Sequence, residues 1–377
     1  MDAAGLLARG DGVLASIRFD GVWKRYGSLA AVENLNLTCP EGEMLALLGP
    51  SGCGKSSTLK MAAGIEDVSA GEIHFGERPV SDLGPKARNV AMVFEDYALY
   101  PHMSVRENVT FPLTVRGLPS AEAKARADSV LDLLGLHQIA DRGVSHLSGG
   151  AQQRVAIGRA LVRDPELILF DEPLSHLDAD QKVHLRGEIK RLQKLSAVTS
   201  ILVTHDQTEA TAMADRIAVM KDGVLQQVAT PHELYAHPAN MFVARFIGEP
   251  PMNLLPLRRD GGRLTVADTG WPLTLDEYRR RLAESSPSGD LVAGVRPERV
   301  TLQPGDAAGL PAVVEYREPR GDVDVIIASA RSGGSVIVAE VSGPSRYRSG
   351  DRVSIAFSES HIHLFAGPHG RNLEVAA

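Results

Sequence analysis

The sequence contains only two cysteines, Cys39 and Cys53, among its 377 residues. Two cysteines cannot build a disulfide framework, so a reducing cytoplasm is the expected compartment. No apolar run approaches the roughly 18 to 20 residues of a membrane-spanning helix, so any role at a membrane requires partner subunits. An excess of positive charge is also absent, because the net charge is −7, and this argues against nucleic acid as a partner.

The length suggests two or three domains. Residues 1–15 carry Asp2, Arg9 and Asp11 among small residues and lack the basic-then-apolar order of a signal peptide, so we expect a frayed tail there. Strands that alternate with helices over 16–245 predict a doubly wound α/β nucleotide-binding domain with a helical insert at about 97–160. Short strands separated by Pro and Gly turns over 246–377 predict a small all-β domain that is barrel-like (OB-like).

The most specific motif is a glycine-rich turn between an apolar strand and a helix. Gly49, Gly54, Lys55 and Ser56 match the phosphate-binding pattern G-x-x-x-x-G-K-[ST] in full. Backbone N–H groups of such a loop surround a β-phosphate, the lysine lies between the β- and γ-phosphates, and the serine hydroxyl ligates Mg²⁺. We therefore predict that a nucleoside triphosphate is bound by Gly49, Pro50, Ser51, Gly52, Cys53, Gly54, Lys55, Ser56 and Ser57.

Two other apolar strands also end in residues suited to chemistry. Asp171 and Glu172 follow the run at 167–170; Asp171 can hold Mg²⁺ and Glu172 can polarise a water for in-line attack on the γ-phosphate. The alternative is that Asp-Glu-Pro merely caps a turn. His205 follows the strand at 200–204, where α/β sites lie, and can reach the γ-phosphate. Its alternative is a hydrogen-bonded structural histidine.

A second anion-binding turn, Ser148-Gly149-Gly150, opens another helix. Alone, Ser-Gly-Gly is usually only a helix cap. Two such turns in one chain are explained if the second contacts a nucleotide that is bound by another copy.

Together these motifs resemble those of the ATP-binding subunits of ABC transporters. The resemblance rests on the phosphate loop, Leu147–Gly150, Leu169–Pro173, Ser175–Asp178 and His205. The segment Val93–His102 is similar to that of importers, and most closely to the maltose-type carbohydrate importer ATPases. Phe246–Leu255 and Gly294–Glu298 resemble parts of that family's C-terminal regulatory β-domain.

The resemblance implies that two copies close head to tail around two ATP molecules. Ser148, Gly149 and Gly150 of one copy then meet the γ-phosphate bound by Lys55 of the other. Tyr26 occupies the position that stacks on adenine, although a tyrosine exposed at a strand end is the alternative. Asp178 lies where the family contacts the partner's phosphate loop. A homodimer is the default, and a degenerate partner cassette stays open.

The resemblance also implies partners and a location. Two transmembrane permease subunits and, indirectly, an extracytoplasmic solute-binding protein are expected, with this chain peripheral on the cytoplasmic face of the membrane. The favoured solute is a sugar or oligosaccharide; a polyamine, glycerophosphodiester, ferric ion or sulfate stays possible. A soluble non-transport ABC ATPase is disfavoured by the single cassette, and an ordinary P-loop kinase leaves Leu147–Gly150 unexplained.

Three positions depart from the family pattern. Glu95 stands where the family usually has a Mg²⁺-ligating glutamine, and a carboxylate can still ligate Mg²⁺. Ala151 replaces a glutamine and His176 a common asparagine. Slower or differently regulated hydrolysis is a hypothesis motivated by Glu95 and Ala151; an unchanged basal rate and Mg²⁺ dependence in Glu95→Gln would remove its Glu95 part.

Overall fold

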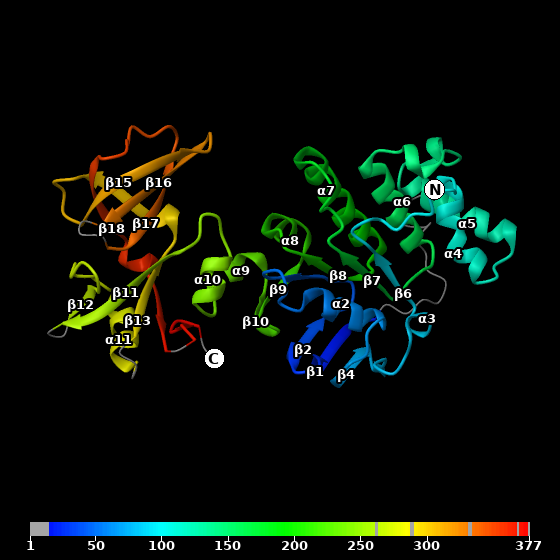
Figure 1. The fold of residues 1–377 in the computed structure, drawn as a ribbon, viewed down its shortest axis with the longest axis horizontal. Helices are drawn as coiled ribbons and strands as arrows, with labels where there is room; N and C mark the ends of the chain where they lie inside the picture. The colour runs from blue at the N-terminus through cyan, green and yellow to red at the C-terminus, as the bar shows by residue number, and fades with distance from the viewer. Residues whose placement is uncertain (1–14, 261–262, 287–289, 331–333, 368, 376–377) are drawn as a thin grey trace. The chain divides into compact units, whose positions relative to one another are not determined.

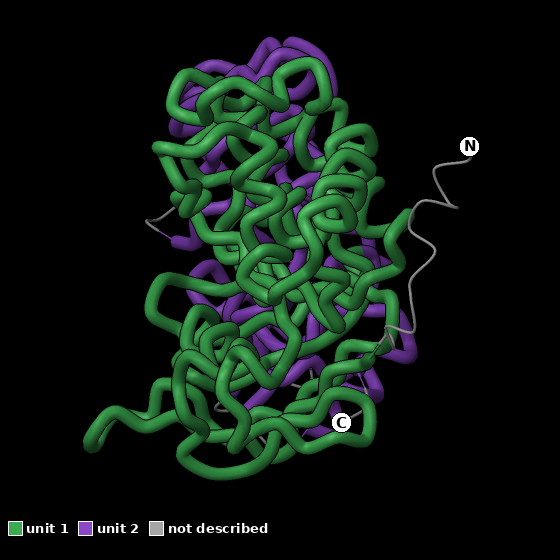
Figure 2. The backbone as a smooth tube through the Cα atoms, turned by 90° about the vertical axis from the view of Figure 1, so that its right-hand side faces the viewer, with its two compact units in different colours: residues 1–231 green, residues 232–377 purple. Residues whose placement is uncertain are grey.

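The computed structural model describes residues 15–260, 263–286, 290–330, 334–367 and 369–375 (Figure 1). The chain divides into two compact units, unit 1 ending at Pro231 and unit 2 beginning at His232 (Figure 2). Of the tail expected at 1–15, residues 1–14 lie outside the described residues. Ala15 is buried, and its carbonyl accepts a hydrogen bond from Thr199 Oγ1 at 2.7 Å, so it belongs to the packed domain.

The division falls before the boundary that the sequence suggested after residue 245. It does so because α10 (Met241–Phe246) and the residues just before it are hydrogen-bonded to the C-terminal end of the chain, while Tyr235 of α9 (Pro231–Ala236) is hydrogen-bonded to Arg296 and Glu298. The Met241 N–H donates to Gly370 O at 2.9 Å, and the Asn372 side chain donates to Pro238 O at 2.9 Å. Pro238 lies between the two helices.

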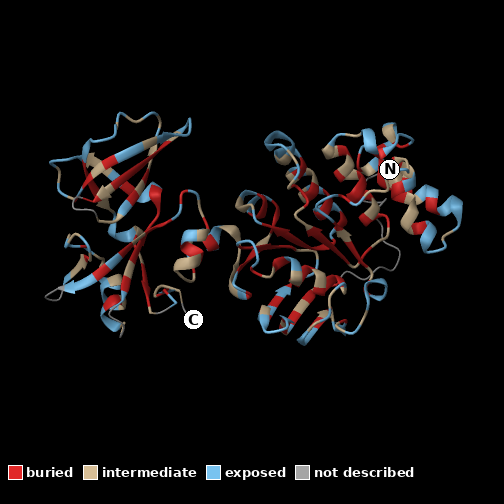
Figure 3. Ribbon diagram, viewed as in Figure 1, coloured by how far each residue is buried: buried red, intermediate tan, exposed pale blue. Residues whose placement is uncertain are grey.

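Unit 1 contains a six-stranded sheet of order β10-β9-β3-β8-β7-β6 and a four-stranded antiparallel sheet of order β2-β1-β4-β5. In the larger sheet β9, β3, β8, β7 and β6 run parallel and β10 is antiparallel to β9. All residues of β3 and β8 are buried, as expected for inner strands of a parallel sheet that is covered on both faces. The strands in the middle of this sheet are coloured mainly as buried in Figure 3. The strands are β1 (Ile17–Tyr26), β2 (Leu29–Cys39), β3 (Met44–Leu48), β4 (Ala70–Phe75), β5 (Arg78–Pro79), β6 (Val90–Val93), β7 (Leu167–Asp171), β8 (Thr199–Thr204), β9 (Arg216–Lys221) and β10 (Val224–Ala229).

A helical region lies between β6 and β7 in the sequence, as expected for the insert. Its first helix begins with a capping box, in which Ser104 Oγ accepts from the Glu107 N–H and Glu107 accepts from the Ser104 N–H. The helices of unit 1 are α2 (Lys55–Ala63), α3 (Pro85–Arg88), α4 (Val105–Val115), α5 (Ser120–Leu133), α6 (Gly149–Leu161), α7 (Ala179–Ser196) and α8 (Gln207–Met213), with short 3₁₀ turns η1 (His137–Ile139) and η2 (Val144–His146).

Unit 2 is mainly β, as predicted, and its strands form two five-stranded sheets of order β12-β11-β13-β19-β20 and β14-β18-β15-β16-β17. Residues from both sheets share one hydrophobic cluster. The strands are β11 (Asn253–Asp260), β12 (Arg263–Val266), β13 (Leu291–Val295), β14 (Val300–Pro304), β15 (Leu310–Pro319), β16 (Val323–Ala330), β17 (Val336–Ser342), β18 (Arg352–Phe357), β19 (His363–Ala366) and β20 (Arg371–Asn372). Short 3₁₀ turns are η3 (Pro297–Arg299) and η4 (Glu359–His361).

The sequence analysis missed one helix of unit 2, α11 (Glu277–Ser285). Asp276 caps it, with its Oδ1 accepting from the Arg279 N–H at 2.8 Å. An aspartate before a run of helix-forming residues is the signal that identifies such a start. Ala283 supplies the helix's contact with the hydrophobic cluster.

The C-terminal end of α2 is held by a buried arginine. Arg88 is 1% exposed, and its guanidinium donates to the carbonyls of Met61, Ala62 (3.0 Å), Leu83 (2.6 Å) and Ser81 (2.9 Å). Two of these carbonyls belong to the last turn of α2, where the Gly64 N–H also donates to Met61 O at 3.1 Å. Burial lowers the pKa of Arg88. The side chain therefore fixes the helix that follows the phosphate loop.

We expect Arg88→Met to lower the free energy of unfolding of unit 1 by about 3 to 5 kcal/mol, because it leaves buried carbonyls without donors. Urea denaturation followed by circular dichroism measures this. Arg78→Met is the matched control, since Arg78 makes an exposed ion pair with Glu166 at 2.8 Å and should cost less than about 1 kcal/mol. Equal losses in the two variants would contradict the assignment.

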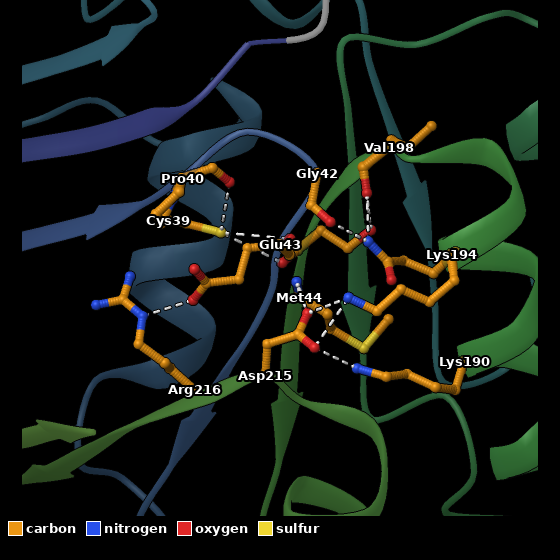
Figure 4. A network of polar contacts seen from close by, with 12 residues as sticks. Cys39, Pro40, Gly42, Glu43, Met44, Lys190, Lys194, Val198, Asp215 and Arg216 are labelled. Carbon is orange, nitrogen blue, oxygen red and sulfur yellow. Dashed lines mark hydrogen bonds and ion pairs between the residues drawn. The ribbon is translucent and has the colours of Figure 1, made fainter. Parts of the chain in front are cut away.

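A polar network joins α7 to the beginning of β3 and β9 (Figure 4). Asp215 accepts from the Met44 N–H at 2.9 Å, from Lys190 Nζ at 2.7 Å and from Lys194 Nζ at 3.1 Å. Arg216 Nε donates to Glu43 at 2.6 Å beside it. Burial acts to raise the pKa of Asp215, but the bonds from Lys190, Met44 and Lys194 outweigh it and the pKa is lowered.

Asp215→Asn should reduce the free energy of unfolding at pH 7 by about 1 to 2 kcal/mol, a modest value because the lysines are partly solvated. The folded pKa of Asp215 lies below its unfolded value of about 4, so this stabilisation is complete above that pH and is lost as the pH falls through the folded pKa. Urea denaturation at pH 7 and pH 3 should show the difference between wild type and variant shrinking. Asp20→Asn, in an exposed pair with Arg18, is the control; a difference that is constant with pH would exclude the ion pairs as its source.

Candidate functional site

The strand register places the sequence-predicted residues at one edge of the large sheet. Leu48 at the end of β3 pairs with Thr204 at the end of β8, and Asp171 at the end of β7 pairs with Val203. Ligands of open α/β sheets bind outside the carboxyl ends of the strands. The residues that follow these strands at this edge are Gly49, Glu172 and His205, with Glu95 after β6.

Two positions of the phosphate loop have no room for a Cβ atom and therefore require glycine. A Cβ on Gly49 would lie 2.3 Å from Met220 O and 2.6 Å from Cys53 Sγ. A Cβ on Gly54 would lie 2.4 Å from Ala31 O, and Gly54 also has a φ of 100°. The loop therefore passes close to neighbouring backbone, which only glycine permits.

Lys55 is the first residue of α2 and is 5% exposed. Its ammonium donates to Gly49 O at 2.7 Å and to Pro50 O at 2.9 Å, so the charge lies inside the loop. Cys53 is also buried, and burial raises the pKa of its thiol although Lys55 acts to lower it. The other predicted loop positions are more accessible: Pro50, Ser51, Gly52 and Ser56 are exposed and Ser57 is half-buried.

Glu172 and His205 are brought into contact by β7 and β8. His205 Nδ1 lies 2.9 Å from Glu172 Oε2, so an Nδ1–H donates to the carboxylate. Glu172 has a left-handed backbone with a φ of 46°, and its N–H donates to Val203 O at 3.0 Å. Strained backbone of this kind persists where the surrounding structure holds it, commonly at functional sites. The imidazole fixes one oxygen of the carboxylate.

Negative charge accumulates beside this pair. The pKa of Asp171 is raised by burial, then by Glu172 and more weakly by Glu95, while Lys60 opposes the shift. A bound cation would relieve this repulsion, so the donor set suits a hard divalent ion. No three His, Cys, Asp or Glu residues in the described ranges lie close enough to hold a metal by themselves. An ion here would depend on a hydroxyl, water or phosphate for its remaining ligands.

Two departures from the family pattern contact each other. His176 Nε2 lies 3.6 Å from Glu95 Oε1, and both side chains are at least half exposed. The pair links the loop after β6 to the loop before α7. An exposed pair of this kind contributes little stability.

Tyr26 is anchored rather than free at the end of β1. Its hydroxyl donates to Glu66 and lies 3.3 Å from Ser57 Oγ, while Lys24 Nζ sits 4.9 Å from the ring centroid. The ring is still 46% exposed. Burial and Glu66 raise the pKa of the hydroxyl. Glu66 was missed by the sequence analysis, because nothing in its loop marks it as a partner of a residue on β1.

Ser148 and Asp178 each cap a helix. Ser148 Oγ accepts from the Ala151 N–H at 3.4 Å at the start of α6, whose first turn contains Gly149 and Gly150. Asp178 accepts from the Gln181 N–H at 2.9 Å at the start of α7. Across the ranges that the structure describes, neither side chain is bonded to the phosphate loop of the same chain.

A buried carboxylate next to His205 was also missed. Glu209 is 2% exposed and accepts from Thr204 Oγ1 at 2.7 Å and from Lys182 Nζ at 3.1 Å. Thr204 precedes His205, and Lys182 lies on α7, so this bond network ties α7, α8 and the end of β8 together. The helix start Asp206-Gln-Thr-Glu209 was the available signal.

Comparison with known proteins identifies the fold. The family model described as "ABC transporter" matches residues 32–175, and the model described as "TOBE domain" matches residues 293–365. The trehalose/maltose import ATP-binding protein MalK of Thermococcus litoralis is 43% identical over 373 residues, covering 95% of this chain and 99% of that protein. The chain belongs to the ABC transporter family. This ABC protein has an ATPase domain followed by a TOBE-type β-domain, and it is an ATPase that energises solute import.

Other relatives of this ABC ATPase carry different names. The sn-glycerol-3-phosphate import ATP-binding protein UgpC of Cereibacter sphaeroides is 43% identical over 361 residues, covering 96% of this chain and all of that protein (100%). Among solved structures, the dimeric structure of MJ0796, a bacterial ABC transporter cassette, is 32% identical with a TM-score of 0.51, covering 57% of this chain and 98% of that one. The predicted family, fold class and ATPase activity are confirmed.

Proposed function

We propose that this ABC ATPase hydrolyses ATP as a dimer with two composite sites. The phosphate loop and Lys55 of one copy bind the triphosphate, and Ser148, Gly149 and Gly150 of the other contact its γ-phosphate. The N-terminus of the 13-residue helix α6 supplies partial positive charge and unpaired N–H groups for this contact. The dimeric structure of the similar cassette MJ0796 supports the assembly. Asp178, which caps α7, would face the partner's phosphate loop.

Each site residue has a role that follows from its surroundings. The exposed face of the Tyr26 ring would stack on adenine, with Glu66 and Ser57 fixing its angle. Ser56, Asp171 and Glu95 would hold Mg²⁺, which when bound would neutralise phosphate charge in the transition state. Lys55 would leave its contacts with loop carbonyls to bind phosphate oxygens.

The observation that carries the proposal is the contact between Glu172 and His205 at the edge where the phosphate loop lies. Glu172 would accept a proton from the attacking water, and His205 would orient the carboxylate and sense the γ-phosphate. The Glu172 side chain is 26% exposed, so a water molecule can reach its carboxylate.

The partners would be two transmembrane permease subunits and, through them, an extracytoplasmic solute-binding protein, with the chain at the cytoplasmic face of the membrane. Within the described ranges, no helix combines the length and apolarity of a membrane span. The name "import ATP-binding protein" of the relatives supports membrane partners.

A sugar or oligosaccharide is the proposed solute, supported by the trehalose/maltose relative. The glycerol-3-phosphate relative is as similar, at 43% identity, and it favours a phosphorylated small molecule as the second candidate. Equal sequence identity to the two relatives is expected, because the nucleotide site does not contact the transported solute.

Co-purification of the full chain with its membrane subunits, followed by ATPase assays in lipid nanodiscs, tests the proposal. Solute-loaded binding proteins should stimulate hydrolysis, and the strongest stimulation should come from a sugar. Failure to bind any membrane protein would refute the transport role, whereas stimulation only by glycerol-3-phosphate would refute the sugar alone.

A further inference from the structure

The segment after β6, Tyr97-Ala-Leu-Tyr100 (segment 97–100), has an unusual backbone. Tyr97 and Ala98 are consecutive non-glycine residues with φ of 60° and 44°. Left-handed backbone is unfavourable for residues with a Cβ, so it persists only where other contacts hold it. Contacts with other parts of the chain therefore hold segment 97–100 in this conformation.

Arg159, in the last turns of α6, makes these contacts. Its NH1 donates to Ala98 O at 2.6 Å and its NH2 donates to Tyr97 O at 2.9 Å. The guanidinium carbon also lies 5.3 Å from the centroid of the Tyr100 ring, within cation–π range. One planar guanidinium thus binds both strained residues and the aromatic ring that follows them, a geometry that lysine cannot reproduce.

The same segment reaches the other end of α6. The Tyr97 side chain is 7% exposed, and a Cβ built on Gly149 would lie 3.8 Å from its hydroxyl oxygen. Gly149 and Arg159 are about 15 Å apart along the helix axis. Segment 97–100 therefore contacts α6 near its first residue and near its last turn.

The contact near the first turn of α6 is incompletely hydrogen-bonded. In the part of the chain that the structure describes, the buried Tyr97 hydroxyl has no hydrogen-bond partner, and neither amide atom of the fully buried Gln153 has one. Gln153 lies one helical turn after Gly149 on the same face.

We propose that Arg159 is a positioning residue that fastens segment 97–100 to α6, so that a displacement of the segment moves Ser148–Gly150 as well. This inference rests on the proposed function, because membrane subunits would supply the displacement and Ser148–Gly150 would deliver it to the partner's ATP.

Amide hydrogen exchange of the isolated full chain tests the attachment without any assay of activity. Arg159→Met should raise exchange by about tenfold both in segment 97–100 and at residues 148–151. Arg159→Lys should give an intermediate increase in the exchange rate. If the methionine variant is unstable, the lysine variant provides the test in a folded protein. Arg116→Met is the control, since Arg116 donates to Arg163 O at 3.0 Å elsewhere in the helical region. Faster exchange confined to segment 97–100 would overturn the proposal.

The assembled complex in nanodiscs provides the second test. In Arg159→Met, the ratio of hydrolysis by the complex with loaded binding protein to hydrolysis by the chain alone should fall about tenfold relative to wild type. Unchanged stimulation would overturn the role of Arg159 and leave the proposed function intact. Absent stimulation in the wild-type complex would instead refute the proposed function, and the inference with it.

Discussion

Replacing Glu172 by glutamine should lower steady-state ATP hydrolysis by about 100-fold or more while ATP binding is retained. The amide has the same size and still accepts the hydrogen bond from His205, so the distance of 2.9 Å between His205 Nδ1 and the side-chain oxygen of residue 172 can be kept. It cannot accept a proton from the attacking water. Phosphate release measures the rate, and equilibrium dialysis with labelled ATP measures binding.

Glu77→Gln, in the exposed turn between β4 and β5, is the matched control and should change neither quantity. A loss of less than about threefold in Glu172→Gln would mean that another group polarises the water. Glu95 is then the candidate, because it adds to the negative charge around Asp171. The double variant Glu95→Gln/Glu172→Gln would decide between them.

Replacing Ser148 by arginine should also lower the rate of ATP hydrolysis by about 100-fold or more, while each monomer still binds ATP. The substitution places a long charged side chain at the first turn of α6 and removes the cap that accepts from the Ala151 N–H. If Ser148 completes the partner's site, the loss arises in the dimer and not in the phosphate loop of the same chain.

Sedimentation distinguishes a loss of activity that arises in the dimer from one that arises in the phosphate loop of the same chain. Glu172→Gln with ATP should accumulate a closed dimer, because hydrolysis no longer reopens it, and the Glu172→Gln/Ser148→Arg double variant should stay monomeric. Ser120→Arg, at the exposed start of α5, controls for added bulk and charge and should dimerise normally. A monomer that hydrolyses ATP at the wild-type rate, or full activity in Ser148→Arg, would refute the composite site.

The sequence predicted the elements whose signals are local. The phosphate loop lies between a strand and a helix within consecutive residues, and Asp171, Glu172 and His205 follow apolar runs directly. Parallel pairing then brings these strand ends to one edge, so the arrangement of the site followed from the order of the elements. The mainly β character of unit 2 followed from its alternating runs and turns in the same way.

Contacts between distant residues could not be predicted in this way. Tyr26 and Glu66 are 40 residues apart, and Arg159 is 61 residues from Ala98, with no periodicity that relates them. Arg88 has the charge of a surface residue and is buried only because four carbonyls surround it. The division after Pro231 depends on hydrogen bonds from α10 to the last strand, which no linker composition reveals.

The network around Asp215 and the chemistry of Glu172 occupy opposite ends of the same sheet. Met44 begins β3, and the nucleotide loop starts after Leu48, about 13 Å further along. Solvent-exposed charges separated by more than the Debye length, about 8 Å at physiological ionic strength, are largely screened from each other. Heat tolerance can therefore be engineered at the amino-terminal edge of the sheet without altering the enzyme's turnover, and the two traits can be selected independently.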